Sequence, residues 1–138
     1  MLPLPTGSYR VGCGFGCYGG HTGQDFPVPA GTPVSSSNTG TVIRSEALRR
    51  GGRYYSYGNL IVIRDATNPA IEVYYAHLSI RDVHVGQTVH AGQIIGRAGY
   101  TGHVIPAGPR GAHLHYEIRI DGTPTAPIRI LSDHKVHS

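Results

Sequence analysis

The chain is poor in charged residues, since Asp, Glu, Lys and Arg together make up only 14% of its 138 residues. Acidic residues are the scarcest of these, and nine histidines outnumber the eight Asp and Glu. No apolar run reaches the roughly 18–20 residues of a transmembrane helix, so we expect no membrane span. Good helix formers are scarce beside 20 glycines and 10 prolines, which argues against a protein of long helices.

What the chain does contain predicts one all-β domain. Its length suits a single domain of about 100–150 residues, and its Tyr, Val, Ile, Thr and Gly content favours strands. We expect a core over about 8–130 and a frayed tail at 132–138. Strands are predicted near 9–14, at 41–45, in a hairpin over 60–78, in short pieces between tight turns over 83–99, and at 113–120. Residues 46–58 and 100–112 are predicted to be loops.

The net charge of +4 is carried by eleven Arg and one Lys. A mild basic excess suits a polyanionic partner. However, no basic run extends beyond Arg49-Arg50 and no nucleic-acid motif is present, so we expect no nucleic-acid partner. The first residues, Met1 to Pro5, lack the charged and apolar regions of a signal peptide. We therefore expect an excised domain, a chain that a larger assembly delivers, or one that acts where it is made.

The two cysteines allow three interpretations. Cys13 and Cys17 could be small buried thiols, or they could form a local disulfide, which would indicate an oxidising compartment. They could also bind zinc with His21 and Asp25, because the four residues follow at a spacing of four. The many glycines between them disfavour the helix that such spacing would require.

The most informative segment is the strand at 113–120. Its polar side chains fall on one face (His113, His115, Glu117, Arg119) and its apolar ones on the other (Leu114, Tyr116, Ile118, Ile120). A shift of one residue would bury two imidazoles, so the apolar face must pack into the core. Two histidines are therefore presented side by side toward solvent or a cleft.

Two other stretches supply side chains that could join them. His77 ends a half-buried row of the returning hairpin strand, which it shares with Tyr75. His21 and Asp25 lie about 13 Å apart on an extended chain, and Gly23 permits the bend that would bring them to one ion.

Zinc in hydrolases takes three N or O protein ligands and leaves one position for water. His21, Asp25 and one of the two strand histidines would meet this requirement. The remaining strand histidine and His77 could then accept a proton or stabilise an oxyanion.

Taken together, these motifs resemble the lysostaphin-type, or LytM-like, zinc endopeptidases of bacterial peptidoglycan. The resemblance covers roughly residues 12–120 in the right order. It rests on Gly14-Phe15-Gly16, His21-Thr22-Gly23-Gln24-Asp25-Phe26, Tyr57-Gly58-Asn59, Tyr75-Ala76-His77-Leu78, Val85-Gly86-Gln87-Thr88-Val89, Ala91-Gly92-Gln93-Ile94-Ile95-Gly96, Gly99-Tyr100-Thr101-Gly102 and His113-Leu114-His115-Tyr116-Glu117.

The resemblance implies a small antiparallel, sandwich-like β core of short strands, with long loops walling a substrate groove. It implies one zinc ion held by His21, Asp25 and His115, with His77 and His113 as the catalytic histidines. The substrate would be a peptidoglycan peptide, cut by a monomer in the cell wall, outside the cell or in the periplasm. The lack of a signal peptide would suit a phage-encoded lysin.

Candidate substrate contacts are Tyr75, Asn59, His103, Arg53 and Tyr55. The basic and aromatic segment around Arg49, Arg50 and Arg53 suggests an anionic substrate. Glu117 shares the histidine face and is a rival general base.

Two other functions stay open. A non-catalytic relative could bind the wall or activate another hydrolase, although such members are expected to lack ligands that are all present here. The pattern over 85–96 also resembles biotinyl, lipoyl and sugar-phosphotransferase carrier domains. A biotinyl or lipoyl carrier needs a lysine in a turn, whereas the sole lysine, Lys135, lies in the tail. A phosphocarrier does not explain Asp25 with His21.

Overall fold

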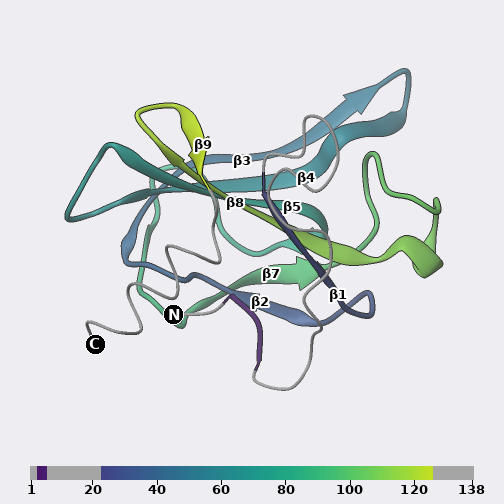
Figure 1. Ribbon diagram of the computed structural model, residues 1–138, viewed down its shortest axis with the longest axis horizontal. Coiled ribbons are helices and arrows are strands. Elements are labelled where there is room, and N and C mark those ends of the chain that lie inside the picture. The colour runs from purple at the N-terminus through teal and green to yellow at the C-terminus, as the bar shows by residue number, and fades with distance from the viewer. Residues whose placement is uncertain (1–2, 6–22, 126–138) are drawn as a thin grey trace.

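The computed structural model describes residues 3–5 and 23–125, and this part is almost entirely β-structure (Figure 1). The strands are β1 (Gln24–Pro27), β2 (Pro33–Ser35), β3 (Gly40–Arg50), β4 (Arg53–Asp65), β5 (Ile71–Arg81), β6 (Thr88–Val89), β7 (Ile94–Ala98), β8 (His113–Ile120) and β9 (Thr123–Thr125). One turn of 3-10 helix, Pro109–Gly111, interrupts the loop before β8. Within this part of the chain, no helix is long and apolar enough to cross a membrane.

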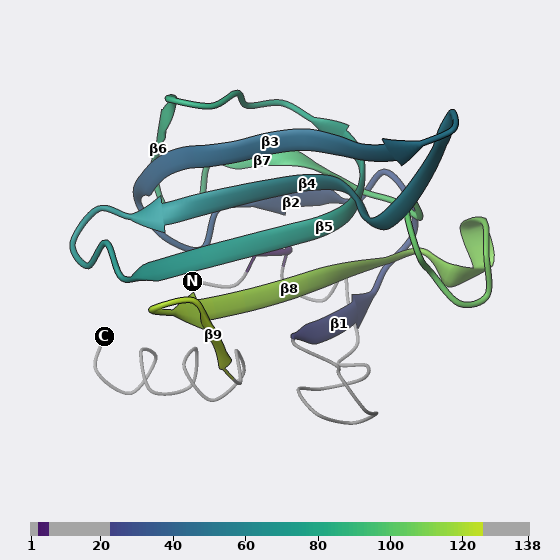
Figure 2. The same cartoon turned by 90° about the horizontal axis from the view of Figure 1, so that it is seen from above.

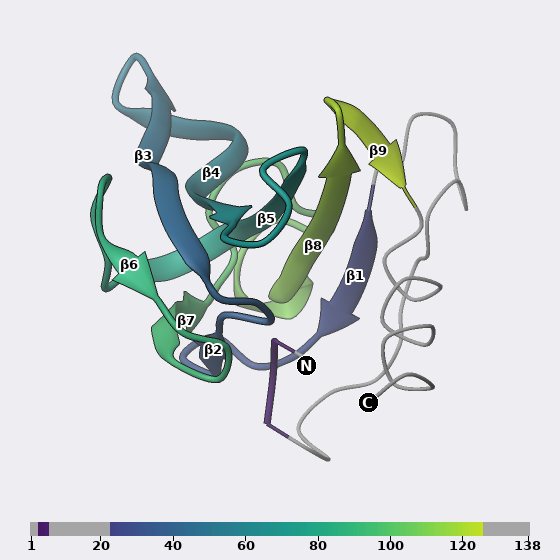
Figure 3. The ribbon, with the colours of Figure 1, turned by 90° about the vertical axis from the view of Figure 1, so that its left-hand side faces the viewer.

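The nine strands of the described residues form one antiparallel sheet, in which six follow one another in the order β1-β8-β5-β4-β3-β6. The long central strands lie side by side in Figure 2, and Figure 3 shows the sheet curling toward β6, β7 and β2. β7 pairs with both β2 and β5, and β9 extends the sheet beyond β8. The expected all-β antiparallel fold is confirmed.

The main core lies on the concave side of this curl. Leu114, Tyr116 and Ile118 of β8 are all buried there, as the alternation of β8 predicted. Tyr75 and Tyr116 are cross-strand neighbours, and both of their hydroxyls bond to Ser37 Oγ, at 3.0 and 2.6 Å. Burial raises the pKa of both tyrosines, so they remain neutral. The opposite face of β8 is thereby left for its histidines.

The predicted loop at 46–58 is wrong. These residues continue β3 and β4 into a long two-stranded hairpin that turns at Gly51 and Gly52, with φ of 59° and 79°. Both sides of this ribbon are largely exposed, so it carries no apolar alternation that would mark it as a pair of strands. The hairpin at 60–78, the short strands within 83–99 and the strand at 113–120 are confirmed.

A bulge in β5 determines where the site forms. From Ile71 to Ala76, β5 pairs with β8, whereas from Leu78 to Arg81 it pairs with β7. His77 lies at the change of partner with φ of 62°, a left-handed conformation that re-aims its side chain. Tyr75 and Leu78 both pack in the main core. In a regular strand only one residue would separate two neighbours on the same face, but here both Ala76 and His77 lie between them and point away from this core. The prediction that His77 shares the face of Tyr75 is therefore wrong.

Several predictions fall outside the described residues. These are the strand near 9–14, the pairing of Cys13 and Cys17, the position of His21 and the frayed tail at 132–138.

Candidate metal and catalytic site

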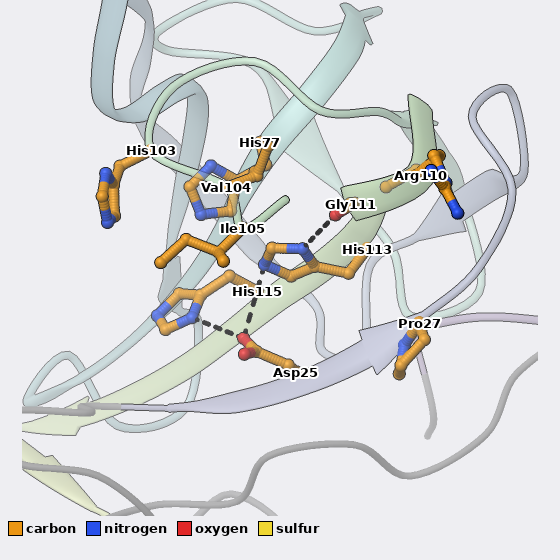
Figure 4. A pocket seen from close by; sticks show the side chains of 11 residues that line it. Asp25, Pro27, His77, His103, Val104, Ile105, Arg110, Gly111, His113 and His115 are labelled. Atoms are coloured by element: carbon orange, nitrogen blue, oxygen red, sulfur yellow. Dashed lines mark hydrogen bonds and ion pairs between the residues drawn. The ribbon is translucent and has the colours of Figure 1, made fainter. Parts of the chain in front are cut away.

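The site begins with a cross-strand pair. Asp25 of β1 lies directly opposite His115 of β8 in the antiparallel register, so both side chains project from the same face. Their atoms Asp25 Oδ1 and His115 Nδ1 are 3.0 Å apart (Figure 4). Both side chains are mostly buried, with 17% and 8% of their surface exposed.

This pair fits two ligands of a zinc ion. Zinc bonds of about 2.0–2.1 Å in a tetrahedron separate neighbouring donor atoms by roughly 3.3 Å. The 3.0 Å between Asp25 Oδ1 and His115 Nδ1 is close to that separation, and both donor types are ones that zinc accepts. Among residues 3–5 and 23–125, no group of three His, Cys, Asp or Glu side chains is gathered as a metal site. The third predicted ligand, His21, is not among those residues.

The electrostatics of His115 reflect the same pairing. Burial opposes a charge on its ring, but hydrogen bonds with Asp25 and Glu117 outweigh burial and raise the pKa of His115 to about 9. In the absence of a metal the ring is therefore a cation between two carboxylates. A metal ion would replace the proton that holds Asp25 and His115 together.

His113 lies beside this pair, since its Nε2 is 3.6 Å from Asp25 Oδ1. Its Nδ1 is 2.8 Å from the Gly111 carbonyl oxygen. A carbonyl only accepts hydrogen bonds, so Nδ1 carries a proton and Nε2 is the ring nitrogen that faces Asp25.

His77 completes the cluster from β5. Its ring centroid is 4.8 Å from that of His113 and 6.0 Å from that of His115. Its Nδ1 donates to the Thr101 carbonyl oxygen at 2.6 Å, which again leaves Nε2 free to accept a proton. Burial, and next the neighbouring His113, lower the pKa of His77 to about 3, so the ring is neutral.

A cavity of about 460 Å³ opens onto these side chains. Asp25, His77, His113 and His115 line its floor, and the loop at 103–112 forms much of its wall (Figure 4). His103 lies on this wall, where the sequence predicted a substrate contact. The loop is anchored to β4, because the His103 amide donates to the Ser56 carbonyl at 2.8 Å.

Two predicted substrate contacts are buried elsewhere. Tyr75 is 0% exposed, lies in the main core and bonds Ser37, so it cannot reach a ligand in the cavity. Asn59 is 5% exposed and its side-chain amide donates to the Leu78 carbonyl. Its backbone amide bonds Thr101 Oγ1 at 3.1 Å, so Asn59 supports the loop residue that holds His77. Neither residue lines the cavity.

Arg53 and Tyr55 lie on the exposed β3–β4 hairpin and do not line the cavity. Arg50 stacks over Tyr55 with its guanidinium carbon 4.7 Å from the ring centroid. Figures 1 and 2 both show this hairpin projecting at the end of the molecule where the loop at 103–112 lies. These residues could therefore contact only a substrate that extends well beyond the cavity.

Glu117 lies behind His115, and its contact there with Tyr57 was not predicted from the sequence. Glu117 is fully buried, and its Oε1 lies 2.8 Å from His115 Nε2 and 2.6 Å from the Tyr57 hydroxyl. Glu117 does not line the cavity, and its contacts are with His115, Tyr57 and Arg119. Its place on the histidine face was readable from the alternation of β8, whereas its contact with Tyr57 was not.

A curled antiparallel sheet with histidines and an aspartate converging on a cavity defines a candidate hydrolytic site. Residues 19–127 match the family described as peptidase family M23, and the chain belongs to that family. The resemblance to lysostaphin-type peptidases is thereby confirmed.

Two curated relatives are similar over most of the chain. The DD-carboxypeptidase/endopeptidase Mpg of Neisseria meningitidis is 41% identical over 110 residues, covering 80% of this chain and 22% of the relative. The peptidoglycan DD-endopeptidase ShyA of Vibrio cholerae is 39% identical over 106 residues, covering 75% of this chain and 21% of the relative. The chain thus spans about a fifth of the length of these proteins.

Solved structures share the fold. The antimicrobial peptidase lysostaphin from Staphylococcus simulans aligns with a TM-score of 0.77 and 32% identity, covering 91% of this chain and 50% of the other. A zinc-containing peptidase from Vibrio cholerae aligns with a TM-score of 0.74 and 30% identity, covering 91% of this chain and 37% of the other.

Proposed function

We propose that this chain is the catalytic domain of a zinc-dependent endopeptidase that hydrolyses peptide stems or cross-links of bacterial peptidoglycan. The observation that carries the proposal is the meeting of Asp25, His115, His113 and His77 on one cavity floor. Family membership supports the reaction class, and the names of relatives such as ShyA support the substrate class. The enzyme would act in the cell wall or periplasm.

We assign the zinc to Asp25, His115 and His21. The oxygen and nitrogen donors 3.0 Å apart support the first two, and family resemblance alone supports His21. A zinc ion bound there supplies Lewis-acid polarisation of the scissile carbonyl and acidification of a water molecule.

The chain's own residues would move the proton. His113 and His77 both have Nδ1 occupied by a backbone carbonyl, so each offers Nε2 to the cavity. One of them accepts a proton as the attacking water bonds to the carbonyl carbon, and the protonated ring stabilises the oxyanion. When the C–N bond breaks, that proton passes to the leaving amine, which balances the hydrolysis.

Digestion of purified walls of several chemotypes, followed by mass spectrometry of the new termini, tests this function. We expect new amino and carboxyl termini within peptide stems or cross-links, with no new reducing sugar ends. A chelator should abolish the products and added zinc should restore them. Walls left intact by zinc-loaded protein would refute the endopeptidase and favour a binding module.

We further propose that the β3–β4 hairpin binds anionic groups of the wall outside the cavity. Arg49 and Arg50 are held over Tyr54 and Tyr55, at 4.9 and 4.7 Å from the ring centroids, which preorganises their charges. The tip is exposed, and further along the hairpin the Ser56 carbonyl accepts a hydrogen bond from His103 in the loop that lines the cavity.

The double substitution Arg50→Gln/Arg53→Gln is expected to slow wall digestion by about tenfold at low salt, because charge attraction raises the local substrate concentration. The difference should vanish near 1 M salt, where the Debye length falls to about 3 Å. The matched control Arg64→Gln/Arg97→Gln removes the same charge from exposed positions elsewhere and should have little effect. Equal rates for both double variants at every salt concentration would exclude a role for the hairpin.

A further inference from the structure

We propose that Glu117 is a positioning residue that orients His115 and sets which of its ring nitrogens can bind the metal. This inference rests on the proposed zinc site. It assigns a function to a buried carboxylate that lies outside the cavity.

The Glu117 side chain has no solvent exposure, and both of its carboxylate oxygens make hydrogen bonds. Its Oε1 meets His115 Nε2 at 2.8 Å and the Tyr57 hydroxyl at 2.6 Å, while its Oε2 accepts from Arg119 Nε at 2.7 Å. Arg119 also reaches the Tyr57 hydroxyl at 3.2 Å. The Tyr57 hydroxyl and Arg119 Nε both donate to Glu117, so both of its oxygens act as hydrogen-bond acceptors.

Glu117 Oε1 accepts in the same way from His115 Nε2 at 2.8 Å, which places a proton on that ring nitrogen. In a neutral ring the other nitrogen, Nδ1, then carries the lone pair. Nδ1 is the atom that lies 3.0 Å from Asp25 Oδ1. Glu117 therefore selects the tautomer in which the metal-binding nitrogen faces Asp25, as carboxylates do for many metal-binding histidines.

The surroundings hold this contact in one geometry. A Cβ placed on Gly23 would lie 3.0 Å from both Glu117 Cγ and His115 Nε2, so only glycine leaves room for the pair. On the other side, the Tyr57 ring centroid lies 5.7 Å from that of His115. Arg119 is itself held by Tyr74, with its guanidinium carbon 4.6 Å from the ring centroid.

A purely structural explanation competes with positioning, because Glu117 also neutralises Arg119. A double variant that removes both charges distinguishes positioning of His115 from neutralisation of Arg119. If neutralisation is the only role, Glu117→Gln/Arg119→Met should recover both stability and zinc affinity. If Glu117 positions His115, the double variant should recover stability but not zinc affinity.

The experiment measures zinc affinity by competition with a chelator and stability by thermal unfolding of the zinc-free protein. Glu117→Gln is expected to bind zinc 10- to 100-fold more weakly than wild type, because an amide can present either an acceptor or a donor to Nε2. In zinc-loaded wild type, ring ¹⁵N shifts of His115 should report a protonated Nε2 that exchanges slowly with water. In Glu117→Gln this proton should exchange faster.

The matched control is Glu72→Gln, which alters a surface carboxylate 3.4 Å from Arg64 and should leave zinc affinity unchanged. If Glu117→Gln does not fold, the zinc affinity of Tyr57→Phe tests the positioning role instead. This substitution removes one hydrogen-bond donor to the Glu117 carboxylate without changing the charge of the protein. Weaker zinc binding by Tyr57→Phe supports the proposal, and unchanged binding overturns it.

The two proposals fail in different ways. Equal zinc affinity in wild type and folded Glu117→Gln overturns the positioning role alone. Recovery of affinity in the double variant also overturns it. A wild-type protein that binds no zinc overturns the metal site itself.

Discussion

Replacing Asp25 by Ala is expected to reduce the rate of wall digestion by roughly 10³-fold. The proposed metal contributes several kcal/mol to the transition state, and each 1.4 kcal/mol is about a tenfold change in rate. Asp25 is the only carboxylate on the cavity floor among the described residues, and it also bonds His115 Nδ1. Its loss therefore removes one proposed ligand and releases another. Zinc content per chain and the rate of turbidity loss of walls should fall together.

The control is Asp82→Ala, because Asp82 is exposed near the end of β5 and its side chain lies away from the cavity. This variant should keep wild-type zinc content and rate. An Asp25→Ala protein that retains one zinc per chain and digests walls at the wild-type rate would remove Asp25 from the site.

The histidine face of β8 was predictable because this strand alternates without interruption over all eight residues. Its apolar residues all lie on the face that packs into the main core. The alternation of side chains along the strand therefore places His113 and His115 on the opposite face. The partner across the strand, Asp25, was also predictable in kind, since it is one of few acidic residues near another histidine. The register that sets Asp25 opposite His115 came only from the structure.

For His77, the alternation of side chains along the strand predicted the wrong face. Alternation directs its side chain to the face of Tyr75, away from His113, whereas the bulge turns it to the opposite face. A bulge depends on β5 changing partner from β8 to β7, which is a long-range event. The family resemblance implied a catalytic role for His77, but no local pattern in the sequence predicted the bulge that turns its side chain toward His113.

The positions of Tyr75 and Asn59, both buried and away from the cavity lining, also could not be predicted from the sequence. Both lie in stretches that match the family, and a matching motif does not distinguish a residue that touches substrate from one that supports the site. Tyr75 packs in the core, and Asn59 holds the turn at Thr101 through its backbone amide. The network of Glu117, Tyr57 and Arg119 joins β4 to β8 across 60 residues, so spacing alone could not reveal it.

Substituting the histidines proposed to be catalytic is expected to give the second large effect. His113→Ala is expected to lower kcat by about 10²–10⁴-fold, the usual contribution of a general acid or base. Zinc content should be unchanged, because His113 is not a proposed ligand. The measurement is kcat on a soluble cross-link peptide together with zinc per chain. The exposed turn residue His90, replaced by Ala, serves as the control and should retain full activity.

His77 requires a different substitution, because its φ of 62° is strained for most residues. Asn tolerates this conformation, so His77→Asn tests the ring without distorting the bulge. If His77 and His113 act in the same proton transfer, the double variant should be no slower than the slower single variant, since residues acting as a unit are not additive. If one is the base and the other independently stabilises the oxyanion, the two losses in kcat should multiply. A wild-type kcat in both single variants would show that neither ring moves the proton, and would leave the floor of the cavity without a base.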